Sequence, residues 1–340
     1  MGGARGMSGP HRNAPGSRDL LRIDSTIQTT STMTPMKPTP TLALLLVAAS
    51  CAPGPAATPK PSAVPASTLE SDVRALVRAA AGDTAEVSVA FLDLQTGDSL
   101  LVDAHVRMHA ASTMKVPVMM ELFRRRTAGG LAMDRGMVLR NAFTSIADGQ
   151  TYSLTAGDDS DPALYERVGG EVTVGELMER MITRSSNLAT NALIALAEPA
   201  RIAQLMERIG ARDMHVLRGV EDNAAYQRGM NNSTTAYALM RVMRAVADPS
   251  VLGEDASREM QAILQRQEFT EMIPAGLPAG TRVANKTGNI TRIAHDAAIV
   301  YPPGRAPYVL VVLTRGFADQ NAAAAVGRDI SAAVWRHVVR

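Results

Sequence analysis

The sequence predicts an α+β fold, in which an antiparallel sheet packs with N- and C-terminal helices and an all-α domain is inserted into the chain. Three observations predict it. Two β-rich segments stand near the start of the folded region, and three more stand near its end. Between them, apolar residues recur at the 3.6-residue spacing of helices, and residues 321–340 repeat that spacing. Strands at both ends with helices between them indicate that the N- and C-terminal parts form one sheet.

The composition is that of a globular protein. The chain has 340 residues, of which 46% are hydrophobic and 20% charged, and this excludes a wholly disordered or fibrous chain. The formal net charge of +2 lacks the positive excess of a nucleic-acid-binding protein, so we expect no nucleic acid partner. A single cysteine excludes an intramolecular disulfide and a multi-cysteine metal site. No other cluster has metal-ligand spacing, so we expect no metal and no other cofactor.

The first 66 residues differ in character from the rest. Residues 1–35 are polar without a sustained period, and we expect a disordered extension or the product of a misassigned start codon. A basic start at residues 36–37, a short apolar stretch and small residues before Cys51 have the layout of a secretory signal. A signal functions at an N-terminus, so Met33 or Met36 is the expected start. Residues 52–66 are rich in proline and alanine and are expected to form a tether.

The residues before Cys51 resemble a bacterial lipobox, Ala48-Ala49-Ser50-Cys51. In such a motif the cysteine is acylated and becomes the new N-terminus, which holds the protein to a membrane without a spanning helix. The alternative is an ordinary signal peptide with an incidental cysteine. Either way we expect export to the periplasmic or extracellular side. No apolar run reaches the roughly 18–20 residues of a membrane-spanning helix.

The folded domain is expected at 67–340, with a sheet part at 67–111 and 254–340 and a helical part at 112–253. A helix start at residues 67–70 precedes a helical pattern that runs to Gly82. Strands are expected at 86–94, 99–106, 281–288, 294–301 and 307–316. Helices are expected at 114–126, 172–183, 187–198, 201–210, 234–246, 257–267 and 321–340. Methionines on the helical faces are expected to fill the core: Met119, Met120, Met178, Met181, Met240 and Met243.

The first candidate for chemistry is the pair Ser112 and Lys115. An apolar helix places the serine at its N-terminus and the lysine one turn later on the same face. A serine hydroxyl is a weak nucleophile until a base takes its proton. Lysine can be that base when burial and the helix N-terminus lower its pKa from about 10.4 towards roughly 7–8. The alternative is a helix cap followed by a solvated lysine, which the apolar surroundings disfavour.

Two further motifs follow in the chain. Ser185-Ser186-Asn187 stands between two helical stretches, where a second hydroxyl and an amide could act on a substrate. Alone, it reads better as the N-cap of the helix at 187–198. Lys286-Thr287-Gly288 ends a predicted strand, where lysine and hydroxyl can bind a carboxylate and the glycine allows close approach of a substrate.

Together and in this order, the three motifs resemble the signature of the penicillin-recognising serine hydrolases, and residues 68–340 resemble the class A β-lactamases. Ser186 replaces the aspartate of the family's Ser-Asp-Asn motif. The resemblance implies an acyl-enzyme on Ser112, with Lys115 as candidate base and Ser185 passing a proton to the leaving nitrogen.

The resemblance also implies how substrate is held. Asn187 would hold the side-chain amide of the substrate, and Lys286 and Thr287 would meet its carboxylate. The backbone N–H groups of Ser112 and Asn289 would form the oxyanion hole. The substrate would be a β-lactam, or a peptidoglycan-like peptide.

The resemblance further implies an Ω-loop glutamate that activates water for deacylation. Glu221 lies in the expected region, but position 225, four residues later, is alanine where the family has asparagine. The alternative for Glu221 is a structural carboxylate paired with Arg218 or Arg228, and Asp222 is a weaker rival as the base. Which of Lys115 and Glu221 is the base for acylation stays open.

Two other patterns in the sequence suggest chemistry that their geometry or spacing disfavours. His295-Asp296 is no Ser–His–Asp triad, because adjacent strand residues point to opposite faces. The acidic run 158–161 lacks the spacing and the glycine of a calcium loop and is expected to be solvated.

Three functions follow as alternatives. The leading one is an exported or lipid-anchored β-lactamase, and the second is a D,D-peptidase or esterase that deacylates slowly from β-lactams. The third is a sensor that stays acylated, which no spanning helix supports. A monomer is the default expectation.

Overall fold

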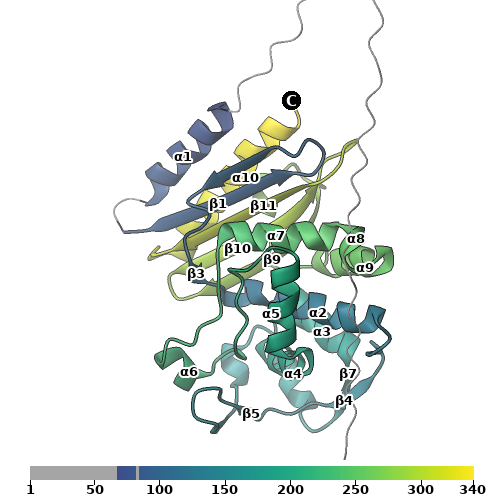
Figure 1. The fold of residues 1–340 in the computed structure, drawn as a ribbon. Helices are drawn as coiled ribbons and strands as arrows, with labels where there is room; N and C mark the ends of the chain where they lie inside the picture. Colours follow the sequence, from purple (N-terminus) through teal and green to yellow (C-terminus); the bar gives the residue numbers. More distant parts are fainter. Residues whose placement is uncertain (1–66, 82–83) are drawn as a thin grey trace, which may run out of the picture. The chain divides into compact units, whose positions relative to one another are not determined.

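The computed structural model describes residues 67–81 and 84–340 (Figure 1). Cys51, the predicted signal and the predicted tether lie outside the described residues. None of the helices described is long and apolar enough to cross a membrane.

One five-stranded antiparallel sheet is formed by both ends of the folded region, as the strand pattern predicted. Its order is β2-β1-β11-β10-β9. The strands are β1 (Glu86–Asp93), β2 (Ser99–Val102), β9 (Arg282–Ile290), β10 (Ile293–Tyr301) and β11 (Tyr308–Arg315). The long connection lies between β2 and β9, and the first strand pairs with the last, Val89 opposite Val312. The predicted α+β sheet is therefore confirmed, and the helical part is inserted between its strands.

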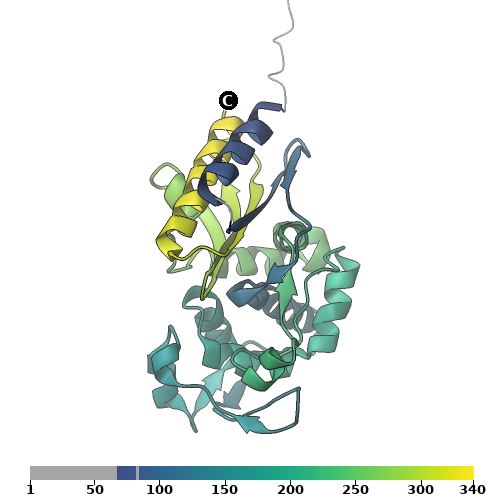
Figure 2. The same cartoon turned by 90° about the vertical axis from the view of Figure 1, so that its left-hand side faces the viewer.

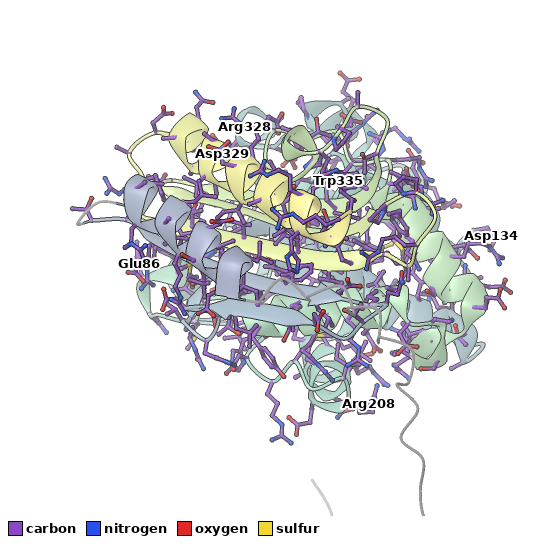
Figure 3. The ribbon with its side chains drawn as sticks, turned by 90° about the horizontal axis from the view of Figure 1, so that it is seen from above. Glu86, Asp134, Arg208, Arg328, Asp329 and Trp335 are labelled. Carbon is purple, nitrogen blue, oxygen red and sulfur yellow. The ribbon has the colours of Figure 1, made fainter. Side chains whose placement is uncertain are left out.

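Helices cover both faces of this sheet, so its central strands are apolar on both sides. On one face α1 (Ser67–Ala81) and α10 (Gln320–Val338) lie side by side (Figures 2 and 3). On the other face α7 (Ala236–Ala247) contacts β1, β10 and β11 (Figure 1). Alternate residues of β11 therefore enter two different cores, with Leu310 in the first and Val311 in the second.

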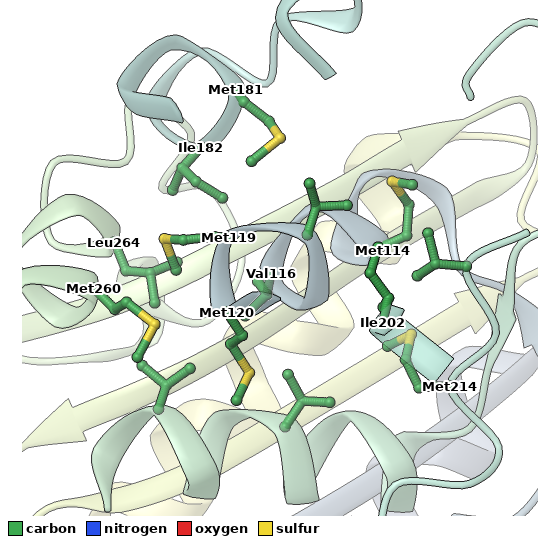
Figure 4. Packing of buried hydrophobic residues seen from close by; sticks show 14 of the residues in the cluster. Met114, Val116, Met119, Met120, Met181, Ile182, Ile202, Met214, Met260 and Leu264 are labelled. Carbon is green, nitrogen blue, oxygen red and sulfur yellow. The ribbon is translucent and has the colours of Figure 1, made fainter. Parts of the chain in front are cut away.

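The inserted part is built around α2 (Lys115–Thr127), which follows a 3₁₀ turn, η1 (Ala111–Met114). The other helices are α3 (Val174–Thr183), α4 (Asn187–Ala197), α5 (Pro199–Arg208), α6 (Asn223–Gln227), α8 (Pro249–Leu252) and α9 (Glu254–Leu264), with 3₁₀ turns η2 (Ala156–Asp158), η3 (Pro162–Arg167) and η4 (Pro274–Gly276). Methionines from α2, α3 and α9 pack together in its core (Figure 4). All six methionines predicted as core are at most 4% exposed, which confirms that prediction.

The insertion is not purely helical, and this differs from the prediction. It contains or borders three short ladders: β3 (Met108–His109) with β8 (Ser233–Thr234), β4 (Gly136–Val138) with β7 (Glu171–Thr173), and β5 (Phe143–Thr144) with β6 (Thr151–Tyr152). Strands of two or three residues are too short to show an alternating pattern. The β3–β8 ladder holds the segment before Ser112 against the segment before α7.

Candidate active site

Ser112 lies in the η1 turn at the start of α2, half-buried beside strand β9. The turn and the strand are in close contact, because a Cβ built on Gly288 would lie 3.0 Å from the backbone nitrogens of Ser112 and Thr113. Only glycine allows this approach without displacing the turn. Ser112 opens into a cavity of about 250 Å³, whose lining residues are Ser112, Asp158, Ser160, Ser185, Asn187, Phe269, Thr287 and Asn289.

Lys115 is fully buried and bonded to the second motif. Its Nζ donates to the Ser185 carbonyl at 2.6 Å, to Ser185 Oγ at 3.1 Å and to Asn187 Oδ1 at 3.0 Å. Burial lowers the pKa of Lys115 to about 7, although the charges of Asp159 and Glu221 act in the opposite direction. An amine with that pKa is available as a neutral base near pH 7.

Ser185 joins the two buried lysines. Its Oγ accepts from Lys115 Nζ and from Lys286 Nζ, each at 3.1 Å. The neighbouring Ser186 does the capping, since its Oγ accepts from the backbone N–H of Ala189 at the start of α4. Both interpretations of the Ser185-Ser186-Asn187 motif therefore hold, each for a different serine.

Lys286, Thr287, Gly288 and Asn289 lie on the edge strand β9. Lys286 is fully buried and also donates to the Thr287 carbonyl at 2.9 Å. Burial, together with the nearby charge of Lys115, lowers the pKa of Lys286 well below its usual range. Thr287 and Asn289 line the cavity beside Ser112. The strand thus places a lysine amine, a hydroxyl and a backbone edge at one site.

Glu221 reaches the same site from the loop between α5 and α7. Its Oε1 accepts from Asn187 Nδ2 at 2.9 Å, while Asn187 Oδ1 accepts from Lys115. Asn187 therefore bridges the buried lysine and the glutamate. Burial raises the pKa of the Glu221 carboxyl, and the charges of Asp158 and Asp159 act in the same direction. The structure brings Ser112, Lys115, Ser185, Asn187, Lys286 and Glu221 together.

The sequence of this chain is similar to those of known β-lactamases. Residues 68–338 match the β-lactamase enzyme family. A β-lactamase of Streptomyces fradiae is 30% identical over 257 residues, which are 73% of this chain and 79% of that protein. The chain belongs to the β-lactamase enzyme family.

Solved structures with the same fold include class A β-lactamases. An ancestral class A β-lactamase is 28% identical with a TM-score of 0.68, over 79% of this chain and 100% of that one. The structure of PBP-A has the same fold at 23% identity, with a TM-score of 0.68 over 82% of this chain and 98% of that one. The predicted class A-like serine β-lactamase fold and enzyme class are confirmed.

The loop that carries Glu221 in this β-lactamase-family protein is closed by polar side chains at its two ends. Asn232 Oδ1 accepts from the backbone N–H groups of Leu217 and Arg218, and its Nδ2 donates to the Arg218 carbonyl. The Arg218 guanidinium donates to Met230, Gly219 and Asn231, and not to Glu221. The predicted structural alternative, a Glu221–Arg218 pair, is therefore wrong.

The other two candidates of the loop also have different roles. Arg228 donates to the Ala147 carbonyl, so it does not pair with Glu221 either. Asp222 is buried and accepts from Ser145 Oγ at 2.7 Å and from the backbone N–H groups of Ile146 and Ala225. Its carboxylate fixes the loop, and Glu221 is the residue that faces the site.

His295 and Asp296 form no triad with Ser112, as predicted. His295 Nε2 bonds the His109 carbonyl at 2.9 Å, and its Nδ1 accepts from the Thr314 N–H. Asp296 accepts from Ile273 N and Asn285 Nδ2. The two side chains serve different faces of β10, where each fixes packing.

The prediction of a solvated acidic loop at 158–161 is wrong for Asp159 and Asp161, whereas Asp158 and Ser160 are exposed as predicted. Asp159 and Asp161 are 8% and 3% exposed. Asp159 accepts from the backbone N–H groups of Asn187 and Leu188, and Asp161 pairs with Arg180 at 2.9 Å. Composition alone does not show that a loop is pressed against helix ends. One feature of the sequence could have indicated this contact: Ser186 replaces the family's aspartate, so a carboxylate at the start of α4 must come from another segment.

In the described part of the chain, no group of three or more His, Cys, Asp and Glu side chains could hold a metal ion.

Proposed function

We propose that this chain hydrolyses β-lactams through an acyl-enzyme on Ser112 and releases the product with water activated by Glu221. One observation carries the proposal. Ser112, Ser185 and Asn187 line one cavity, and of these Ser185 Oγ accepts from Lys115 and Lys286 while Asn187 donates to Glu221. This supplies a nucleophile, a proton path and a second base in one place.

In the acylation step Ser112 Oγ attacks the lactam carbonyl carbon, and its proton passes to the neutral amine of Lys115. The negative carbonyl oxygen is bound by the backbone N–H groups of Ser112 and Asn289. The carbon–nitrogen bond then breaks, and the proton moves from Lys115 through Ser185 Oγ to the leaving nitrogen. The 3.1 Å contact between Lys115 Nζ and Ser185 Oγ supports that path. Lys286 and Thr287 bind the carboxylate of the substrate.

In the deacylation step Glu221 takes a proton from a water molecule, whose oxygen attacks the ester carbonyl. Ser112 Oγ leaves and takes up the proton that Glu221 received, which restores both groups. Asn187 Nδ2 donates to Glu221 at 2.9 Å, and this bond orients the carboxylate. Residue 225 is alanine and has no polar side chain that could help to hold the water.

The alternative function is a D,D-peptidase or slow-deacylating penicillin-binding protein that uses the same site on a peptidoglycan-like peptide. Ala225 favours it, because the family's second water-holding side chain is absent there. A variant of PBP-A, which shares the fold, has been solved as an acyl-enzyme complex with penicillin G.

The deciding experiment incubates the full chain with benzylpenicillin and follows intact mass and free penicillin with time. An adduct on Ser112 that forms and clears, with many equivalents hydrolysed, supports the β-lactamase. A persistent adduct supports the penicillin-binding alternative. If there is no adduct and no hydrolysis, both functions are rejected. The control is S112A, which must show no adduct and no hydrolysis.

We also propose that the protein is exported and anchored by an acylated Cys51, on the sequence pattern alone. Expression in a bacterial host with labelled palmitate tests it. Label on the wild type and none on C51A supports the anchor, whereas an unlabelled secreted protein supports simple cleavage.

A further inference from the structure

The acidic segment before η3 makes more contacts with the active site than its sequence suggests. Asp159 Oδ1 and Oδ2 lie 3.0 and 2.9 Å from the backbone nitrogen of Asn187, and Oδ2 lies 2.9 Å from that of Leu188. Tyr165 Oη donates to Oδ2 at 3.0 Å, and Asp161 N donates to Oδ1 at 3.0 Å. Asp159 is 8% exposed, and its carboxylate accepts these five hydrogen bonds from protein groups.

We propose that Asp159 is a positioning residue of this active site, which anchors the start of α4 and thereby orients Asn187 between Lys115 and Glu221. The inference rests on the proposed function, because it concerns the same reaction.

The start of α4 needs such an anchor. The first N–H groups of a helix have no partner inside the helix, and a negative charge there is favourable. Ser186 satisfies only the N–H of Ala189. Asp159 satisfies the N–H groups of Asn187 and Leu188. In the resembling family an aspartate stands at the position of Ser186, so the charge here comes from a different segment of the chain.

Anchoring the backbone of Asn187 controls its side chain, since the amide makes two bonds to reactive groups. Its Oδ1 accepts from Lys115 and its Nδ2 donates to Glu221. A shift of the backbone at residue 187 would move both bonds at once. Misplacement of a catalytic group by about 1 Å lowers rates by roughly 10²-fold.

Asp159 also contributes charge to the site. Three ionisable groups face Lys115: Asp159, Glu221 and Lys286. The carboxylate of Asp159 favours the protonated form of Lys115 and disfavours the ionised form of Glu221, on which Asp158 acts in the same direction. Without Asp159, both groups would lose their protons at lower pH.

The test compares D159N with D161N, in the full chain, by the pH dependence of kcat/KM for benzylpenicillin. Asp161 is the matched control, since it is also buried, at 3% exposed, but pairs with Arg180 and Arg184. For D159N we expect kcat/KM lowered by about 10²-fold and the acidic limb moved to lower pH. For D161N we expect a lower Tm with the acidic limb unmoved. A D159N limb at the wild-type pH, with no greater loss of kcat/KM than in D161N, overturns the inference.

Two further measurements separate the outcomes. The wild type is assayed first. If it shows neither turnover nor adduct, the proposed function fails. If it turns over at the same rate as D159N, only the positioning role of Asp159 is rejected. If D159N does not fold, the double variant D159N/S186D restores a carboxylate at the start of α4, next to Asn187 in the chain. Recovery of folding and of activity supports the inference. No recovery shows that Asp159 serves only its own loop and overturns it.

Discussion

Three active-site residues other than glycine have positive φ angles: Ala111 at 46°, Ser185 at 57° and Glu221 at 59°. Such a conformation costs about 1–3 kcal/mol per residue and persists where the surroundings fix it. Here the surroundings are specific: β9 packs on Ala111, Lys115 binds the Ser185 carbonyl, and Asn187 binds the Glu221 carboxylate. The three strained residues lie in the turn that carries Ser112, in the proposed proton path and at the proposed second base.

At Glu221, replacement by glutamine removes the base and keeps the size of the side chain. We expect acylation of Ser112 by benzylpenicillin to persist and deacylation to slow by about 10²–10⁴-fold, the range for loss of a general base. Stopped-flow turnover and intact mass check this. The control is E259Q, since Glu259 pairs with Arg126 and does not line the cavity beside Ser112. Undiminished turnover in E221Q would reject the assignment.

At Lys115, the pKa of about 7 predicts how the acylation rate depends on pH. Protonation removes the base, so the rate falls as pH drops below about 7 and reaches its plateau above it. The acylation rate of E221Q is measured by quench and mass across pH. Its acidic limb should persist and lie at lower pH than in the wild type, because the charge of Glu221 that raises the pKa of Lys115 is gone. If the acidic limb disappears in E221Q, then Glu221 and not Lys115 is the base for acylation.

At the scale of elements, the loop that carries Glu221 is ordered by its ends. Asn232 makes three hydrogen bonds with the backbone of Leu217 and Arg218 and is 3% exposed. Buried polar groups that lose their partners cost about 1–3 kcal/mol. These bonds fix the base of the loop, and the loop places Glu221 beside Asn187.

We expect N232A to slow deacylation more than acylation, because Ser112 and Lys115 lie outside the loop. Burst kinetics with benzylpenicillin measure both steps, and a thermal melt reports the expected loss of about 1–3 kcal/mol. N223A is the control, since Asn223 is exposed on the same loop. Equal slowing of both steps would contradict the view that the loop acts on deacylation alone.

At the scale of the folded unit, the two faces of the sheet carry two separate cores, and Ser112 lies beside only one of them. The core between α1, α10 and the sheet contains Leu310 and Val312, whereas Met114 and Val116, next to Ser112, belong to the other core. Because β1 pairs with β11, the sheet forms only after both ends of the folded region are present.

We expect L310A to lower stability by about 2–5 kcal/mol, as large-to-small core substitutions do, and to leave kcat unchanged below its melting range. Each kcal/mol lowers Tm by roughly 2–4 °C in larger domains. Calorimetry and steady-state kinetics check both parts. L101A, at a side chain 37% exposed on β2, is the control with little change. A lowered kcat in L310A would show that the two cores are coupled.

Local patterns in the sequence predicted most of the fold and half of the site. The five long strands and the main helices have clear periods, and Ser112, Lys115, Ser185 and Lys286 stand in motifs whose chemistry depends on residue type and spacing. The two- and three-residue ladders could not be predicted, since a pattern needs more residues than they contain. Glu221 was found only through its place in a family, and its neighbours left its partner open.

The sequence by itself determined which residues can form strands, helices and a serine–lysine nucleophile, because these properties depend on neighbours within one turn or one strand. Only the tertiary structure decided that Lys115 and Lys286 are fully buried around one hydroxyl, and that Glu221 faces Asn187 and not Arg218. It also showed that Asp159, one residue of the acidic run, is buried against the start of α4. The physical reason is the same each time: burial and the pairing of charges are set by segments that lie far apart in the chain and meet only when it folds.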